Sequence, residues 1–460
     1  MQGTLDKKNR RNTLLVVIVT AFMTTVNSSS LNLSIPGISA EFGVSAQAIG
    51  WLVTLYTLCS VSLALPFGKI ADVTSRVKIM RYGILIFAVG VCLGGFAWNF
   101  SSLLIFRFLQ GVGSSMIFAT STAVLIAAFK PEERGRIIGY SVCATYIGLS
   151  SGPVIGGLIN GYFGWRAVMY ATAAVSVMVT LIAFTKLPDN QAKTESHKLD
   201  YTALLLYSIG IALLMYGLSE IGIGYVGYVF VVAGIVIMAA FIKREVRYER
   251  EGLEPVLKIS LFKRKNFSYS NLAALMNYAA TYAVSYYMSI YLQLVRGYSS
   301  QIAGIILISA PLVQAVLSPW AGRQSDKHSP YKLSSAGMGC CAASLLLLAF
   351  VGESTPLYFI VPILALLGLG FALFSSPNTN AIMSSVEPAD SGIASSIVAT
   401  MRNCGQTMSM AIITVIIGIT MGNVSINNAG AALIVTTMHW IFAVFSVVCV
   451  VGIFLSLRRK

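Results

Sequence analysis

Long apolar runs alternate with short polar segments along the whole chain. Each run is nearly free of charge and about 20 residues long, the length a helix needs to cross a bilayer. The runs are continuously apolar and lack the period-two alternation of barrel strands, so they predict membrane-spanning helices. The predicted spans are 14–34, 46–67, 79–98, 103–129, 135–160, 165–186, 201–220, 225–242, 267–294, 301–321, 332–351, 357–383, 391–421 and 429–456. Fourteen spans, an even number, place both ends of the chain on one side of the membrane.

Glycine and proline residues recur at the same spacings in the two halves of the chain. Gly111 precedes Pro131 and Gly135 by 20 and 24 residues, and Gly368 is followed by a proline and a glycine at the same offsets. Internal repeats of this kind are common in secondary transporters. The sequence therefore predicts an all-α polytopic membrane protein with two pseudo-symmetric six-helix bundles and an inserted two-helix hairpin. The expected domains are an N-terminal bundle (1–188), a linker with the hairpin and a cytoplasmic amphipathic segment (189–265), and a C-terminal bundle (266–460).

Composition and charge agree with this organisation. The chain is 56% hydrophobic and 11% charged, with a mean hydropathy of +0.77, which excludes a soluble protein with a single core. The net charge of +15 could suggest a nucleic-acid partner. However, most of the 32 Lys and Arg residues fall on one side of the predicted topology. By the positive-inside rule, the chain is expected to be a multi-pass protein of the cell membrane with both termini cytoplasmic.

A polar loop at residues 68–78 separates the second and third apolar runs. A shorter segment of similar sequence occurs at 322–327. This loop resembles the signature loop of the major facilitator superfamily. The stretches 107–113 and 148–157 resemble the fourth-span and antiporter motifs of that family, and 26–36 is similar to the first-span motif of its fourteen-span drug:proton antiporters. The resemblance covers essentially the whole chain. It implies export of drugs or amphiphiles by proton exchange, with two bundles rocking about a central site.

The polar loop has a physical interpretation of its own. Asp72 can accept from helix-end amides and pair with Arg76 or with bases on a neighbouring helix. Such a latch is stable in one conformer and must break in the other, although the charges could equally serve only to fix topology. The expected latch residues are Gly68, Asp72, Arg76, Lys78, Gly322 and Asp326.

A glycine stripe predicts close helix packing in the fifth span. Gly148, Gly152 and Gly156 recur every four residues and share one helical face, where another backbone can approach closely. Pro153 removes a backbone donor and bends the helix. The stripe could form a seam between the bundles or ordinary small-residue packing. The expected seam residues are Gly148, Gly152, Pro153, Gly156 and Gly157.

Charged and aromatic residues inside the spans mark a candidate binding site. Arg107 and Arg402 lie within predicted spans, where a charge is costly unless it faces the protein interior or water. Aromatic faces with hydroxyl tips, as on Tyr278 and Tyr282, suit a planar organic solute. The candidate substrate-binding residues are Asn27, Asn32, Tyr56, Arg107, Gln110, Tyr146, Tyr278, Tyr282, Gln314, Asn378, Arg402 and Gln406.

The first span lacks a titratable acid. The resembling antiporters commonly have an aspartate where Asn27 stands, and asparagine can neither titrate nor pair with a cation. A cavity with bases and no acid favours a neutral or anionic, aromatic solute over a lipophilic cation. Secondary active transport of such a solute, of the drug or metabolite efflux type, is the main hypothesis. An importer of a flat vitamin-like metabolite such as a flavin, a lipid flippase and a membrane sensor are the alternatives.

The expected partners follow from this interpretation. They are a small-molecule substrate and membrane lipid, with protons as a candidate coupling ion; no nucleic acid, cofactor or metal is expected, and the chain is expected to be a monomer. No nucleotide-binding loop or catalytic constellation occurs in the sequence, so neither an ATP-driven pump nor an enzyme is supported.

Overall fold

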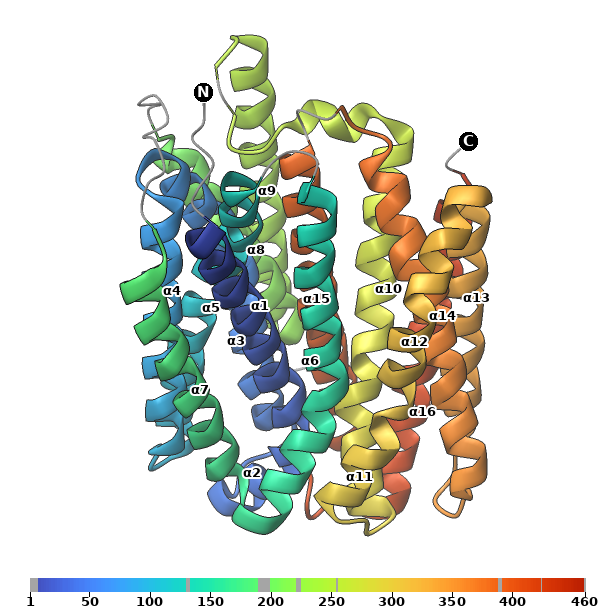
Figure 1. Ribbon diagram of the computed structural model, residues 1–460. Helices are drawn as coiled ribbons and strands as arrows, with labels where there is room; N and C mark the ends of the chain where they lie inside the picture. The colour runs from blue at the N-terminus through green and yellow to red at the C-terminus, as the bar shows by residue number, and fades with distance from the viewer. Residues whose placement is uncertain are drawn as a thin grey trace.

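The computed structural model describes residues 7–129, 133–188, 199–220, 225–253, 255–387, 391–422 and 424–458, and its regular structure there is helical (Figure 1). The first half contains α1 (Lys7–Ser30), η1 (Leu31–Ser34), α2 (Ile35–Phe42), α3 (Ala46–Val73), α4 (Arg76–Gly95), α5 (Phe100–Ala128), α6 (Arg134–Phe163) and α7 (Trp165–Lys186). The pair α8 (Tyr201–Glu220) and α9 (Tyr225–Arg250) follows. The rest contains η3 (Ile259–Lys263), α10 (Lys265–Ile290), η4 (Tyr291–Val295), α11 (Ser300–Leu307), α12 (Ser309–Lys327), α13 (Pro330–Leu348), α14 (Leu357–Met383), α15 (Ser391–Met421) and α16 (Ala431–Leu457).

Twelve helical stretches in the described part of the chain are long and apolar enough to cross a membrane. The stretches α1–η1–α2 and α11–α12 each count once among them. The helices α6 and α10 are not among the twelve but run alongside the others in Figure 1. Helix α1 begins and α16 ends at the same end of the molecule, which we refer to as the terminal end. The chain is therefore an all-helical, multi-pass membrane protein.

Several helices differ in detail from the runs that hydropathy predicts. The first run is interrupted by the 3₁₀ turn η1, and the run at 301–321 is divided at Ile308 into α11 and α12. Helix α9 continues past the expected end of its span to Arg250. Beyond it, the rest of the segment expected to be partly an amphipathic helix contains, among its described residues, only the short turn η3. Its Leu261 packs on Phe267 and Ile382 inside the protein.

The two halves share one packing detail. A Cβ added to Gly113 on α5 would lie 2.7 Å from the carbonyl oxygen of Gly83 on α4. A Cβ added to Gly370 on α14 would lie 2.8 Å from the carbonyl oxygen of Gly337 on α13. Both pairs of helices therefore cross at glycines, because any side chain would hold the backbones apart.

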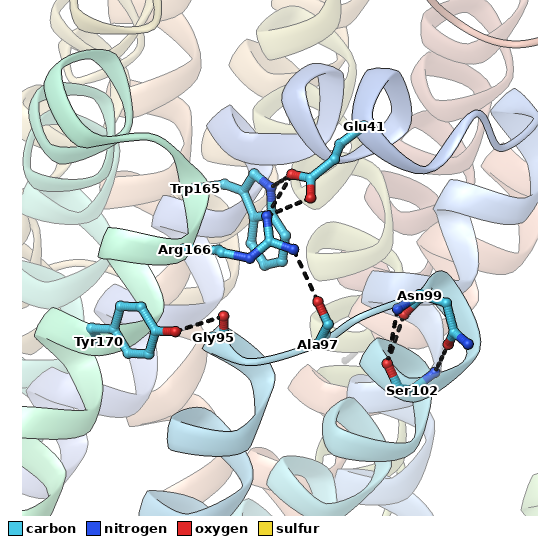
Figure 2. A network of polar contacts seen from close by, with 8 residues as sticks. All are labelled: Glu41, Gly95, Ala97, Asn99, Ser102, Trp165, Arg166 and Tyr170. Carbon is cyan, nitrogen blue, oxygen red and sulfur yellow. Dashed lines mark hydrogen bonds and ion pairs between the residues drawn. The ribbon is translucent and has the colours of Figure 1, made fainter.

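The end of the molecule away from the termini is held together within the N-terminal bundle by a polar network (Figure 2). Glu41 on α2 accepts hydrogen bonds from the Trp165 indole (2.7 Å) and from Arg166 (2.6 Å) at the start of α7. The Arg166 guanidinium also donates to the Ala97 carbonyl (2.9 Å), between α4 and α5. Nearby, Tyr170 donates to the Gly95 carbonyl (2.8 Å). The network fixes α2, α7 and the α4–α5 turn to one another.

The same end also joins the two bundles, and we refer to it as the closed end. Five hydrogen bonds cross between the bundles there: Asn32 to the Ser285 hydroxyl (3.1 Å), Ser289 to the Asn32 carbonyl (2.8 Å), Gln293 to the Leu33 carbonyl (3.3 Å), the Ala46 amide to the Val424 carbonyl (3.0 Å) and Asn427 to the Pro36 carbonyl (3.2 Å). The break in the first helix at η1 exposes the carbonyls that accept two of these bonds. The conformer is thus sealed at the closed end.

Candidate functional site

A small polar cavity lies between the bundles near the middle of the spans. It is lined by side chains of α1, α3, α5, α6 and α15: Thr24, Thr25, Ser28, Tyr56, Thr57, Ser60, Phe118, Thr145, Leu149, Arg402, Asn403 and Gln406. Its free volume is about 30 Å³, which is room for about two water molecules. Drug-sized solutes occupy pockets of roughly 300 Å³ or more. The bundles must therefore move apart before such a solute can fit.

The chemistry of the lining is uneven. One guanidinium, two side-chain amides and several hydroxyls face the cavity, and no described lining residue is an acid. Arg402 reaches across the cavity, with its guanidinium 5.9 Å from the centre of the Phe118 ring on α5. The cavity can donate hydrogen bonds and positive charge to a solute and can present an aromatic face.

Three of the sequence-derived candidates line this cavity: Tyr56, Arg402 and Gln406. The sequence analysis missed the hydroxyls of α1, namely Thr24, Thr25 and Ser28. Threonines in a helix usually return their hydroxyl to a carbonyl one turn back, as Thr25 does to Ala21 (2.8 Å), so they give no distinctive signal. The only available signal was their position on the same helix as Asn27.

Arg107 lies behind the cavity wall. Its side chain is 1% exposed and donates to the Leu52 carbonyl (3.0 Å) and to Gln110 (2.6 Å). Gln110 in turn donates to the Gly90 carbonyl (2.9 Å). The guanidinium lies 4.6 Å from the centre of the Tyr56 ring, and that ring lines the cavity. Arg107 and Gln110 therefore tie α3, α4 and α5 together, and the Arg107 guanidinium lies next to the Tyr56 ring of the cavity wall.

The two candidate tyrosines of α10 lie in different environments. Tyr282 is within electrostatic range of Arg107 and Tyr56 and lies near Ser28 of the first bundle, and its buried hydroxyl has no hydrogen-bond partner among the described residues. Tyr278 packs within the C-terminal bundle, with its ring 5.4 Å from that of Phe371. Thus Tyr282 approaches the cavity from the second bundle, and Tyr278 supports α10 from behind.

The remaining candidates are spread along the bundle interiors. Asn32 bonds across the closed end, as described above, and Asn378 donates to the Ser270 carbonyl (3.1 Å). Asn27 and Gln314 are buried, and the Asn27 amide has no hydrogen-bond partner among the described residues. The Tyr146 side chain lies outside the described residues.

The latch residues lie at the terminal end. Asp72, at the end of α3, forms an ion pair with Arg76 at the start of α4 (2.7 Å), and both side chains are partly exposed. Gly68 faces Ala119 and Gly322 faces Ser376, both within their own bundles. Lys78 closes the first turn of α4 through its backbone amide. The Asp326 side chain lies outside the described residues.

The glycine stripe of α6 serves two contacts. Gly148, Gly152 and Gly156 face α1 within the N-terminal bundle, at Phe22, Ser29 and Ser30. Gly157 instead faces Ser300 at the start of α11, where an added Cβ would lie 2.5 Å from the Ser300 carbonyl oxygen. The Pro153 carbonyl contacts Gly304 of α11. One helix thus carries both ordinary small-residue packing and a contact between the bundles.

Two helical bundles with a small cavity between them, near the middle of the apolar helices, are an arrangement found in solute carriers. The family model of the Major Facilitator Superfamily matches residues 17–410 and 272–460, and the chain belongs to that superfamily. It is therefore a transporter of that superfamily.

The relatives include one named as a riboflavin transporter and one named as an export protein. The chain is 30% identical over 400 residues to the riboflavin transporter RibZ of Clostridioides difficile (strain 630), covering 86% of each chain. It is 26% identical over 429 residues to the cephamycin export protein CmcT of Amycolatopsis lactamdurans, covering 90% of this chain and 87% of that protein. The fold is also that of a bacterial homologue of the lysosomal transporter Spinster, with a TM-score of 0.73 at 15% identity over 99% of this chain and 98% of the other.

Proposed function

We propose that this transporter moves a neutral or anionic, planar aromatic solute across the membrane by alternating access and leaves it chemically unchanged. The observation that carries the proposal is the cavity lining, which combines Arg402, Asn403 and Gln406 with hydroxyls and includes no described acid. A lipophilic cation entering that cavity meets like charge with no counter-ion, at a cost that grows as the surroundings become less polar.

Alternating access is supported by the contrast between the closed end and the cavity. Five hydrogen bonds seal the bundles at the closed end, and the cavity beyond them is too small for a drug-sized solute. Rocking of the bundles would widen the cavity at one end and break contacts at the other. The substrate-site residues in this scheme are those of the cavity wall, with Tyr282 and Arg107 acting next to Tyr56.

The second candidate function is flavin transport, favoured by the likeness to RibZ. A flavin ring system has one edge of carbonyl and imide groups and carries a polyhydroxylated chain. Arg402, Asn403 and Gln406 could bond such an edge, and the threonines and serines of α1 and α3 could bond the chain. Export of an anionic or neutral drug uses the same contacts, so the two candidates differ in substrate and not in site.

The membrane arrangement we propose has fourteen spans. It adds α6 and α10 to the twelve apolar stretches and treats α8–α9 as a hairpin inserted between two six-helix bundles. The terminal end is then cytoplasmic and the closed end external, since the clustered bases of the sequence fall at the terminal end. A cysteine placed at Thr185 and labelled by an impermeant thiol reagent in intact cells would contradict this orientation.

A thermal-shift screen of the purified protein tests the substrate class, because a ligand that binds the native state raises its apparent stability. We expect riboflavin and anionic aromatic compounds to raise the melting temperature, and Arg402→Gln to weaken the effect of the anions. Ethidium should leave the melting temperature unchanged. Stabilisation by ethidium and not by the neutral or anionic compounds would overturn the proposal.

A further inference from the structure

A buried carboxylate lies at the terminal end, outside the cavity. Glu245 is on α9, three residues beyond the expected end of its span at 242, and its side chain is 0% exposed. One carboxylate oxygen accepts from the Leu257 backbone amide (2.7 Å). The other has no hydrogen-bond partner among the described residues. A carboxylate buried with one oxygen unsatisfied is costly unless the group is neutralised.

The amide that bonds to Glu245 belongs to residues 255–264, which we refer to as the strap. In Figure 1 the strap crosses the terminal end from α9 to α10. It is fastened at both ends. On the α9 side, Glu249 also accepts from the Ser260 amide (3.1 Å). On the other side, Arg264 donates to the Ser385 carbonyl (3.0 Å) and to Glu387 (3.0 Å), just after α14.

The hairpin that carries Glu245 is hydrogen-bonded to the N-terminal bundle, and its α8 also packs on Cys404 of α15 in the second bundle. Tyr207 and Ser208 on α8 donate to the carbonyls of Val61 (3.3 Å) and Ser62 (2.9 Å) on α3. The strap therefore links a unit attached to the first bundle with a unit attached to the second. Rocking of one bundle against the other would move Arg264 relative to α9 and pull on the strap between Ser260 and Arg264. If that pull displaces the Leu257 amide by several ångströms, its 2.7 Å hydrogen bond to Glu245 is lost.

The charged groups around Glu245 include Lys69 on α3 and Asp200 before α8, with Arg244 next to it on α9. Arg244 is engaged by Asp200 through two hydrogen bonds (2.7 and 3.0 Å). Burial alone would raise the pKa of Asp200, but this pairing lowers it, so Asp200 stays ionised. Burial raises the pKa of Glu245, and Asp200 adds to the rise, whereas the strap amides and Lys69 oppose it.

We propose that Glu245 binds a proton from the cytoplasm when the strap is docked and releases it when the strap moves away, so that cytoplasmic pH sets the balance between the two conformers. The proton adds to the unsatisfied carboxylate oxygen, and no other group changes. Burial away from water disfavours the charged carboxylate. A conformer in which the Glu245 carboxyl is buried therefore binds the proton more tightly than one in which it is exposed to water. By linkage, acidification favours the docked conformer and rising pH favours the undocked one.

This inference rests on alternating access in the proposed function, and not on the identity of the solute. It assigns a titratable group to a carrier whose first span has Asn27 in place of an acid. The control of the cycle then comes from the hairpin and the strap, outside the substrate cavity.

The test measures the distance between the two bundles at the terminal end. Spin labels are placed through Thr185→Cys and His328→Cys, both at exposed positions, in a background without the seven native cysteines, and the protein is studied in nanodiscs. Between about pH 5 and pH 8, the ratio of the two distance populations should change by up to about tenfold per pH unit. In Glu245→Gln this dependence should disappear, with the docked population favoured.

Two further variants keep the test decisive. Lys69→Met removes a charge that favours the ionised carboxyl and should move the midpoint up by about one pH unit. Glu251→Gln, on a surface pair with Arg247, is the matched control and should leave the midpoint unchanged. A wild-type ratio that does not depend on pH, or a Glu245→Gln protein that titrates like wild type, overturns the inference.

The same samples separate this inference from the proposed substrate class. If riboflavin or an anionic dye shifts the distances but pH does not, the pH inference fails and the proposed function stands. If pH shifts the distances but no neutral or anionic solute does, the reverse holds.

Discussion

Ser289 offers the sharpest test of the closed end. Its hydroxyl donates to the Asn32 carbonyl (2.8 Å) and accepts from Gln293 (3.0 Å), so it joins the two bundles in the present conformer. When the closed end opens, water can replace both bonds. Ser289→Ala should therefore destabilise only the closed conformer. The loss of a buried hydrogen bond with its acceptor left unpaired costs about 1–2 kcal/mol.

That energy corresponds to roughly a 5- to 30-fold shift in the ratio of closed to open conformers. Spin labels at Trp98→Cys and Phe350→Cys, two exposed positions at the closed end of the two bundles, report the ratio. Ser446→Ala is the matched control, since it removes a buried bond of 3.0 Å to the Ala342 carbonyl within one bundle. It should lower stability equally in both conformers. Equal distance distributions in the Ser289 and Ser446 variants would refute the reasoning.

Three further predictions follow from the site and its supports. Arg402→Gln should weaken transport of anionic solutes by roughly 10- to 100-fold, as expected for a lost charge-assisted hydrogen bond. Transport of neutral solutes should not change. Arg323→Gln, at an exposed position, is the control and should leave transport of both kinds of solute unchanged. Gly152→Ala should lower the unfolding free energy by about 1–3 kcal/mol, because the new Cβ would lie 2.9 Å from the Cβ of Ser29. Gly339→Ala is the control, since its new Cβ would meet nothing within 4 Å. Equal melting temperatures of the two variants would contradict this prediction. Asp72→Asn should change the stability of the present conformer by less than about 1 kcal/mol, because the pair with Arg76 is partly exposed. If this pair acts as a latch, the variant must also shift the population away from this conformer and slow transport.

The membrane helices could be predicted because hydropathy depends on local composition alone. The two largest differences are the 3₁₀ turn η1 and the break at Ile308. They lie a few residues before Pro36 and Pro311, and hydropathy takes no account of a proline. The segment 243–266 was expected to be partly an amphipathic helix, because charged and apolar residues are interleaved there. Its apolar residue Leu261 instead packs inside the protein, and Glu245 holds its backbone.

The site could be predicted only in part. Arg402 and Gln406 stand out because polar side chains are rare in apolar runs, and the structure brings both to the cavity. Arg107 stood out for the same reason, but its guanidinium donates hydrogen bonds to the Leu52 carbonyl and to Gln110, behind the residues that line the cavity. Sequence cannot distinguish a charge that faces a cavity from one that ties helices together, because both must be buried.

The most direct test of the central claim is transport by the purified protein in proteoliposomes, with riboflavin and ethidium compared side by side under an imposed proton gradient. The account predicts saturable movement of riboflavin or of an anionic aromatic solute, reduced for the anion by Arg402→Gln, and no movement of ethidium above protein-free liposomes. Robust, proton-driven ethidium transport that is insensitive to Arg402→Gln would contradict it.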